Sequence, residues 1–182
     1  PKDTASGLLK LVLLLAVFNT AYLSWRYLAL ESGFAVRGSG FCSLTEFVDC
    51  DEVLSTPQAR AFYVPNALLG FGFFFGCFIW LSAGFRFFPD SRRTILLILG
   101  FWLLIASGLT LYFFWLLVRL PNLCPLCPWN HLLTYCALLL TVSAYRKTPE
   151  NTESMTVSSI AALAAVCIGQ FAAWLFLWQF LR

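Results

Sequence analysis

Five long, almost uninterrupted apolar stretches leave this chain few ways to fold. A helix needs about 20 mostly apolar residues to cross the hydrocarbon layer of a membrane, and each stretch is near that length. We therefore predict an all-α integral membrane protein in which residues 1–182 form one membrane domain. The five predicted transmembrane helices cover residues 11–30, 64–85, 95–118, 126–145 and 157–181.

The charge content agrees with this interpretation. Only 12% of the residues are charged and 60% are hydrophobic, whereas soluble domains carry about 25% charged residues. The net charge of +3 is spread over the chain, so no basic patch favours nucleic acid as a partner. Seven of the 12 Lys and Arg residues fall on the N-terminal side of the predicted membrane. This small excess predicts a cytoplasmic N-terminus.

By position, the seven cysteines form a group of four and a group of three. Cys42 and Cys50 lie in a long polar loop at about residues 33–63, and Cys124 and Cys127 lie where the fourth predicted helix begins. Two helices separate these pairs, so both pairs are expected on one membrane face, the outer one, where disulfides persist. Three others lie inside apolar stretches, where cysteine behaves as a small hydrophobic residue. These three packing residues are Cys77, Cys136 and Cys167.

The segment "NLCPLCPWNH" suits thiol chemistry. Its prolines predict a helix starting near Pro125 or Pro128. Both thiols then lie near the helix N-terminus, where the helix dipole favours the thiolate form. The thiolate is the form that attacks disulfides. A static disulfide is one alternative. A zinc site that includes the loop pair is another, but the seven residues between Cys42 and Cys50 suit zinc poorly. We predict no metal.

The loop is also expected to carry local structure. "SLTE", Ser43 to Glu46, fits a capping box and predicts a short helix leading to Cys50. Loops of this length are usually functional.

Two polar residues stand just inside the membrane near the thiols. His131 follows Cys127 by one helical turn, and Asn66 lies at a matching depth in the second predicted helix. Together they suggest a site for a lipid-soluble carbonyl compound. The alternative is that each side chain only bonds a neighbouring backbone carbonyl.

The order of these motifs resembles a known family. A C-x7-C loop, then "CDEVLSTPQARAFYVPNALLG", then "CPLC" looks like the vitamin K epoxide reductase homologues, and the bacterial branch most, over about residues 10–182. DsbB-type quinone reductases do similar chemistry, but their C-x-x-C pair precedes the loop pair.

The resemblance implies a four-helix bundle around a quinone, ubiquinone or menaquinone, with one extra peripheral helix. It also implies a relay of thiol exchanges. A thioredoxin-like partner passes two electrons to Cys42 and Cys50, Cys50 exchanges with Cys124, and Cys127 reduces the quinone.

Further positions come from the same resemblance. The quinone-binding positions of the family fall on Asn66 and His131, and an active-site hydroxyl falls on Thr56, with Ser55 beside it. Two departures are a Tyr63 where many relatives have Gly, and a histidine at 131 where tyrosine is frequent. Many relatives carry a fused thioredoxin-like domain and this sequence has none, so the partner is expected to be a separate periplasmic DsbA-like protein.

We therefore interpret the chain as a membrane thiol:quinone oxidoreductase with a DsbB-like role. It is expected in the bacterial inner (cytoplasmic) membrane as a multi-pass protein, with its redox cysteines facing the periplasm. Two alternatives remain open. The same cysteines suit reduction of vitamin K epoxide or a related quinone, and a non-enzymatic membrane subunit would use them as structural or metal-binding residues.

Overall fold

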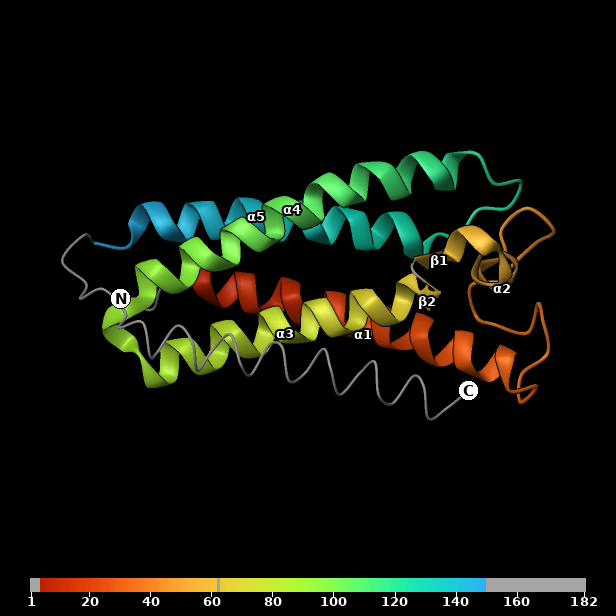
Figure 1. Ribbon diagram of the computed structural model, residues 1–182, viewed down its shortest axis with the longest axis horizontal. Helices are drawn as coiled ribbons and strands as arrows, with labels where there is room; N and C mark the ends of the chain where they lie inside the picture. Colours follow the sequence, from red (N-terminus) through yellow and green to blue (C-terminus); the bar gives the residue numbers. More distant parts are fainter. Residues whose placement is uncertain (1–3, 62, 150–182) are drawn as a thin grey trace.

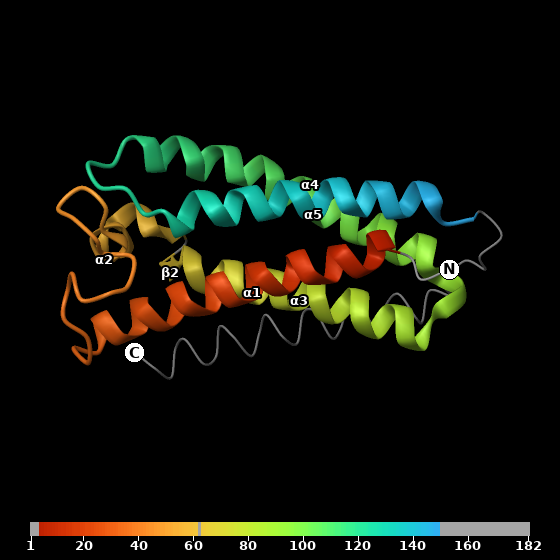
Figure 2. The same ribbon diagram turned by 180° about the vertical axis from the view of Figure 1, so that it is seen from behind.

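The computed structural model describes residues 4–61 and 63–149, and these are mostly helical (Figure 1). Neighbouring helices pack as a closed four-helix bundle, in which α1 contacts α3 and α5, and α4 contacts α5 and α3. The view from behind shows the same arrangement (Figure 2). The four long helices are α1 (Thr4–Glu31), α3 (Asn66–Phe87), α4 (Arg92–Val118) and α5 (Leu126–Lys147).

The two ends of the bundle differ in what connects the helices. At one end, the short turn η2 (Pro89–Ser91) joins α3 to α4. The other end carries the α1–α3 connection and the α4–α5 connection (Figure 1). The longer connection contains α2 (Cys50–Ser55), η1 (Pro57–Ala59), β1 (Arg60–Ala61) and β2 (Val64–Pro65). The two strands pair antiparallel.

Among the described residues, three helical segments are long and apolar enough to cross a membrane, namely Thr4–Glu31, Asn66–Phe87 and Pro89–Val118. With 22 residues, α5 is also long enough, at about 1.5 Å of rise per residue. Its first turns are more polar, because they include Asn130 and His131. The fifth predicted span, residues 157–181, lies outside the described residues.

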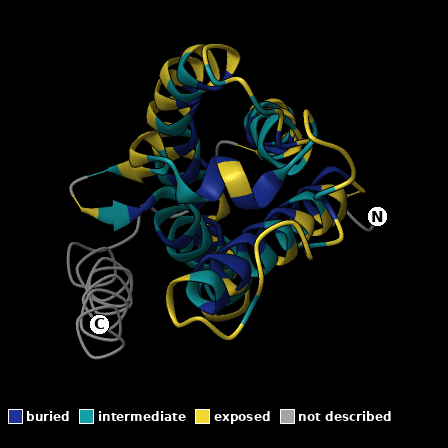
Figure 3. Ribbon diagram, turned by 90° about the vertical axis from the view of Figure 1, so that its right-hand side faces the viewer, coloured by how far each residue is buried: buried dark blue, intermediate teal, exposed yellow. Residues whose placement is uncertain are grey.

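The outward faces of the helices are apolar, as a lipid environment requires. Large hydrophobic side chains point away from the bundle on each of α1, α3, α4 and α5, among them Phe18, Phe87, Phe101, Leu111 and Leu139. Soluble proteins rarely expose apolar surface of this extent. The bundle is therefore suited to a membrane, and the burial colouring of Figure 3 shows the buried residues on the parts of the helices that face the other helices.

Buried hydroxyl groups in the bundle bond to their own helices. Thr20 donates to the carbonyl of Ala16 at 2.7 Å, and Ser107 donates to Leu103 at 2.8 Å. Thr134 and Thr141 do the same on α5. In this way these four hydroxyl groups are buried with a hydrogen-bond acceptor.

The loop differs from the prediction in one respect. The helix expected to start at Ser43 is not there, and the prediction is wrong. Instead, α2 begins at Cys50, and the Asp49 carboxylate caps it by accepting from the backbone N–H groups of Asp51 and Glu52. Asp49 combines a β-region backbone with a side-chain acceptor, which is the usual geometry of an N-cap.

The turn between β1 and β2 explains a departure seen in the sequence. Tyr63 has a φ of 65°, in the left-handed region where glycine is favoured because it lacks a Cβ atom. Its side chain is 83% exposed. The backbone conformation at this position therefore favours glycine, and this chain adopts it with a tyrosine.

Candidate functional site

A parallel β-bridge joins the loop to the segment that precedes α5. Val48 pairs with Leu123, and the Asp49 N–H donates to the Leu123 carbonyl at 3.0 Å. Asp49 directly precedes Cys50, and Leu123 directly precedes Cys124. Both cysteines belong to one buried apolar cluster at this end of the bundle. The bridge thus brings the two predicted redox pairs into one site.

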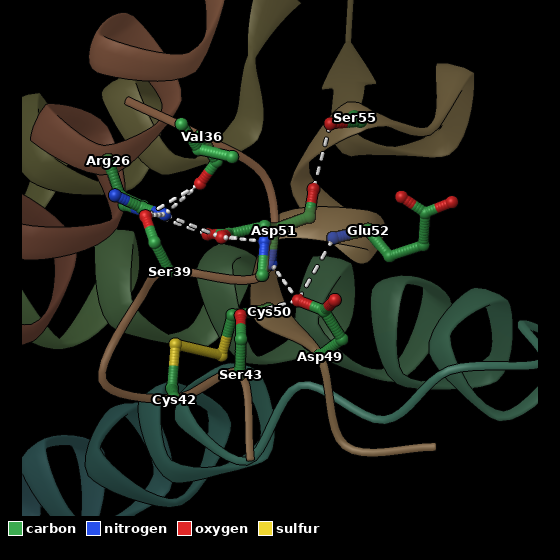
Figure 4. A network of polar contacts seen from close by, with 11 residues as sticks. Arg26, Val36, Ser39, Cys42, Ser43, Asp49, Cys50, Asp51, Glu52 and Ser55 are labelled. Carbon is green, nitrogen blue, oxygen red and sulfur yellow. Dashed lines mark hydrogen bonds and ion pairs between the residues drawn. A yellow bond between two sulfur atoms is a disulfide. The ribbon is translucent and has the colours of Figure 1, made fainter. Parts of the chain in front are cut away.

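The loop pair is a disulfide between Cys42 and Cys50, with their Cα atoms 5.7 Å apart. Both residues are buried, with exposed fractions of 2% and 0%. The Ser43 hydroxyl donates to the Asp49 carboxylate, which also caps α2 (Figure 4). The residues flanking both cysteines are therefore tied to each other by the cap as well as by the disulfide.

The helix pair consists of two free thiols. Cys124 and Cys127 lie on either side of the start of α5, with Pro125 as its N-cap. Their sulfur atoms are 2.8 Å apart. Contact with the Cys127 thiol lowers the pKa of Cys124 below its usual value. Burial raises this pKa, but backbone N–H groups at the helix start also lower it. The site therefore favours the thiolate at Cys124.

A cavity of about 420 Å³ opens beside the helix pair. Its walls come mainly from α3, α4 and the first turns of α5, and they are largely apolar. A volume of this order holds a small organic ligand. Cys127, Asn66, His131 and Thr56 are among its polar lining residues, and the others are Thr20, Gln58, Thr110, Asn130 and Thr134.

Asn66 and His131 approach the cavity from different helices. The Asn66 side-chain amide donates to the Gln58 carbonyl at 3.0 Å, while its Oδ1 is buried with no hydrogen-bond partner among the residues that the structure describes. The His131 ring meets Phe114 edge to face, with centroids 6.2 Å apart. A buried acceptor of this kind at a cavity wall is a place for a ligand donor.

The two hydroxyl residues after α2 differ in position. Thr56 lines the cavity, and its hydroxyl donates to the Val53 carbonyl at 2.8 Å. Ser55 is not among the lining residues, and its hydroxyl donates to the Asp51 carbonyl at 2.8 Å. The structure therefore brings Thr56, but not Ser55, to the cavity with Asn66.

Two of the remaining cysteines, Cys77 and Cys136, lie away from this site. Cys77 is buried in the apolar core of the bundle, and Cys136 is a half-buried thiol on α5. Cys167 lies outside the described residues.

Asn19 is a residue of the site that the sequence analysis missed. Its side-chain N–H group donates to the Leu126 carbonyl at 3.1 Å and to Asn130 Oδ1 at 3.4 Å. Leu126 lies between the two cysteines of the helix pair, so Asn19 ties α1 to the first turn of α5. An asparagine in the middle of an apolar stretch was the available signal.

Arg26 and Asp51 form a second missed feature, a buried ion pair beside the loop disulfide. Arg26 Nε donates to Asp51 Oδ1 at 2.7 Å, and Nη2 donates to Oδ2 at 2.6 Å. Their side chains are 5% and 0% exposed. Burial alone would raise the pKa of the Asp51 carboxyl, but Arg26 and the backbone N–H groups of Gly38 and Gly40 hold it below the usual value. From sequence, Arg26 counted only as an outer-face charge.

Comparison with known proteins identifies the family. The sequence model of the vitamin K epoxide reductase family matches residues 8–142, well over half of the 182-residue chain. This match confirms the resemblance found from the cysteine spacing. Searches of curated proteins and of solved structures returned no significant match.

Proposed function

The chain belongs to the vitamin K epoxide reductase family, and from this premise we propose that it is a membrane thiol:quinone oxidoreductase. Membership already implies a membrane oxidoreductase that works with cysteines and a quinone. The finer proposal is that it reoxidises a separate thioredoxin-like, disulfide-forming protein and passes two electrons to a membrane quinone.

One observation carries this proposal. A loop disulfide, a thiol pair and an apolar cavity follow one another at one end of the bundle, in the order that electrons would take. The Asp49–Leu123 hydrogen bond aligns the loop pair with the helix pair, and Cys127 opens into the cavity. A packing role for the cysteines would not require this succession.

The proposed relay consists of balanced exchanges. A partner dithiol reduces the Cys42–Cys50 disulfide and leaves as a disulfide. The Cys50 thiolate then attacks Cys124 in the oxidised helix pair, and Cys42 attacks Cys50, which releases Cys124. A low pKa makes Cys124 a good leaving group in this second step.

Reclosure of the Cys124–Cys127 disulfide releases two electrons and two protons. A quinone in the cavity would accept both and leave as a quinol. Each 30 mV by which its potential exceeds that of the thiol pair contributes about 1.4 kcal/mol of drive.

The residues around the cavity fit a quinone head group. The walls are apolar, which suits a lipid-soluble ring. The unpartnered Asn66 Oδ1 is an acceptor for a hydroxyl donor, and the Asn66 amide and His131 ring supply donors for carbonyl oxygens. These two residues would orient the ring next to Cys127.

The membrane setting is part of the same proposal. The protein would lie in a bacterial inner membrane with five spans, its N-terminus in the cytoplasm and its redox end in the periplasm. The excess of Lys and Arg on the N-terminal side supports this orientation. A membrane enzyme suits the task because its thiol partner is soluble in water and its acceptor is soluble in lipid.

The decisive test is turnover with both substrates. Purified protein is given a reduced thioredoxin-like protein and a short-chain quinone, and quinone reduction is followed by absorbance. We expect turnover that Cys50→Ser abolishes with the protein partner only, and that Cys127→Ser abolishes with any reductant. Cys77→Ala and Cys136→Ala serve as matched controls and should retain the parent rate.

Two results would contradict the proposal. Full partner-dependent turnover by Cys50→Ser would remove the relay. Turnover of vitamin K epoxide but of no quinone would favour the alternative substrate.

A further inference from the structure

Arg26 holds two separate parts of the loop at once. Besides its two bonds to Asp51, its Nη2 donates to the Val36 carbonyl at 2.8 Å and to the Ser39 hydroxyl at 2.8 Å (Figure 4). The Gly38 N–H also donates to Asp51 Oδ2, at 2.9 Å. The guanidinium of α1 therefore joins residues 36–39 to the first turn of α2.

These two segments are the ones that the loop disulfide joins. Residues 36–39 precede Cys42 with only Gly40 and Phe41 between them, and Asp51 directly follows Cys50. The covalent bond and the Arg26 contacts are thus parallel connections between the same two stretches of chain. One is broken chemically in every cycle of the proposed reaction, whereas the other is not.

We propose that Arg26 is a positioning residue that keeps Cys50 beside Cys124 while the Cys42–Cys50 disulfide is open. This inference rests on the proposed function, because only a redox cycle opens the disulfide repeatedly. Without such a brace, reduction would free the loop between its remaining anchors, and Cys50 would reach Cys124 less often.

The chemistry of arginine fits this role. A guanidinium has five N–H donors in a fixed plane and stays charged when buried, so it can bind a carboxylate with two bonds and still reach two further acceptors. A Cβ atom at Gly40 would lie 3.0 Å from Arg26 Nε and 3.0 Å from Asp51 Oδ1. The loop therefore closes over the ion pair where it has no side chain.

Cross-linking tests the brace without quinone or partner. In a Cys42→Ser, Cys127→Ser background, only Cys50 and Cys124 remain of the two pairs, and mild oxidation should join them. We expect Arg26→Met to lower the yield of this cross-link at least tenfold, as read by peptide mapping. Arg26→Lys keeps the charge but not the fork of donors, and should give an intermediate yield.

Arg60 provides the matched control. It pairs with Glu31 at 2.6 Å at the same end of the bundle, but the two side chains are 35% and 51% exposed, unlike those of Arg26 and Asp51. Arg60→Met should leave the cross-link yield within twofold of the parent. An equal loss in this variant would mean that any lost ion pair loosens the loop, which would overturn the specific role of Arg26.

Hydrogen exchange separates a redox-dependent brace from a general folding role. With all cysteines present, the backbone amides of residues 36–54 in oxidised Arg26→Met should be as protected from exchange as those of the parent. Their protection should fall below that of the parent only after the disulfide is reduced. Equal loss in both redox states, or a parent-like cross-link yield, would overturn the inference. A failure of quinone turnover alone would contradict the proposed function. The cross-link yield and the hydrogen exchange would still test the role of Arg26, because neither measurement needs a quinone.

Discussion

Asp49 and Leu123 are joined by a backbone hydrogen bond of 3.0 Å, and each is followed directly by a predicted redox cysteine. Two bundle helices, α3 and α4, separate these residues along the chain. In a parallel bridge the chain directions agree, so the next residue on each strand continues alongside its neighbour. The register of this one bridge therefore brings Cys50 and Cys124 to the same end of two paired segments.

The bridge can be weakened by removing one donor. The Leu123 N–H donates to the Phe47 carbonyl at 2.7 Å, and Leu123→Pro deletes that N–H. One such bond contributes about 0.5–1.5 kcal/mol, so we expect exchange between Cys50 and Cys124 to slow by about 2- to 10-fold. Quench-alkylation with a gel-shift count of free thiols measures the rate. Leu123→Ala keeps the N–H and should exchange like the parent.

The cavity prediction concerns Asn66 and His131. Asn66→Ala and His131→Phe should each raise the quinone KM or lower the rate while leaving exchange between Cys50 and Cys124 intact. Loss of one donor to developing charge costs about 10²–10³ in rate in well-studied enzymes, and we expect less here because two donors share the ligand. Steady-state quinone reduction is the measurement. Parent-like rates in both variants would place the quinone elsewhere.

Tyr63 offers a stability test with a predicted sign. A non-glycine residue in the left-handed region destabilises the folded state by about 1–2 kcal/mol. Glycine removes this strain but loses more chain entropy on folding, which offsets about 0.5–1 kcal/mol of the gain. Tyr63→Gly should therefore raise the melting temperature in detergent by a few degrees. Gly33 has a φ of 72° with open space around it, so Gly33→Ala should lower the melting temperature. A lower value for Tyr63→Gly would indicate that the exposed ring contributes to folding.

The pH dependence of stability should report on Asp51. Its folded pKa lies below the unfolded value, which is about 3.9. The ion pair with Arg26 therefore stabilises the protein fully above that pH, and this contribution is lost as the pH falls through the folded pKa. The melting temperature of the parent should exceed that of Asp51→Asn at neutral pH, and the difference should shrink below about pH 4. A constant difference would contradict this assignment.

The helices could be predicted from sequence because the membrane leaves few alternatives. Uninterrupted apolar stretches must satisfy their backbone groups internally, so α3 and α4 fall close to their predicted ranges. The predicted first span, residues 11–30, starts too late, because α1 begins at Thr4. Helix ends depend on local capping and fraying more than on composition.

The loop could be predicted less well, because its structure depends on partners far away in the chain. Ser43 had the spacing of a cap, but its hydroxyl bonds to Asp49, and Asp49 is the cap. Arg26 carried no sign that it would bind Asp51 across the loop. Cysteine spacing located the chemistry, while the contacts that align it depend on tertiary packing.

The gathering of both cysteine pairs at one end of the bundle has an electrical consequence. Moving one elementary charge through 100 mV of membrane potential involves about 2.3 kcal/mol. In the proposed relay, the electrons pass between neighbouring sulfur atoms at a single membrane face and never travel along the helices. If the quinone takes up its two protons from that same face, the transfer moves no net charge across the membrane, and the rate of disulfide formation does not depend on whether the membrane is energised.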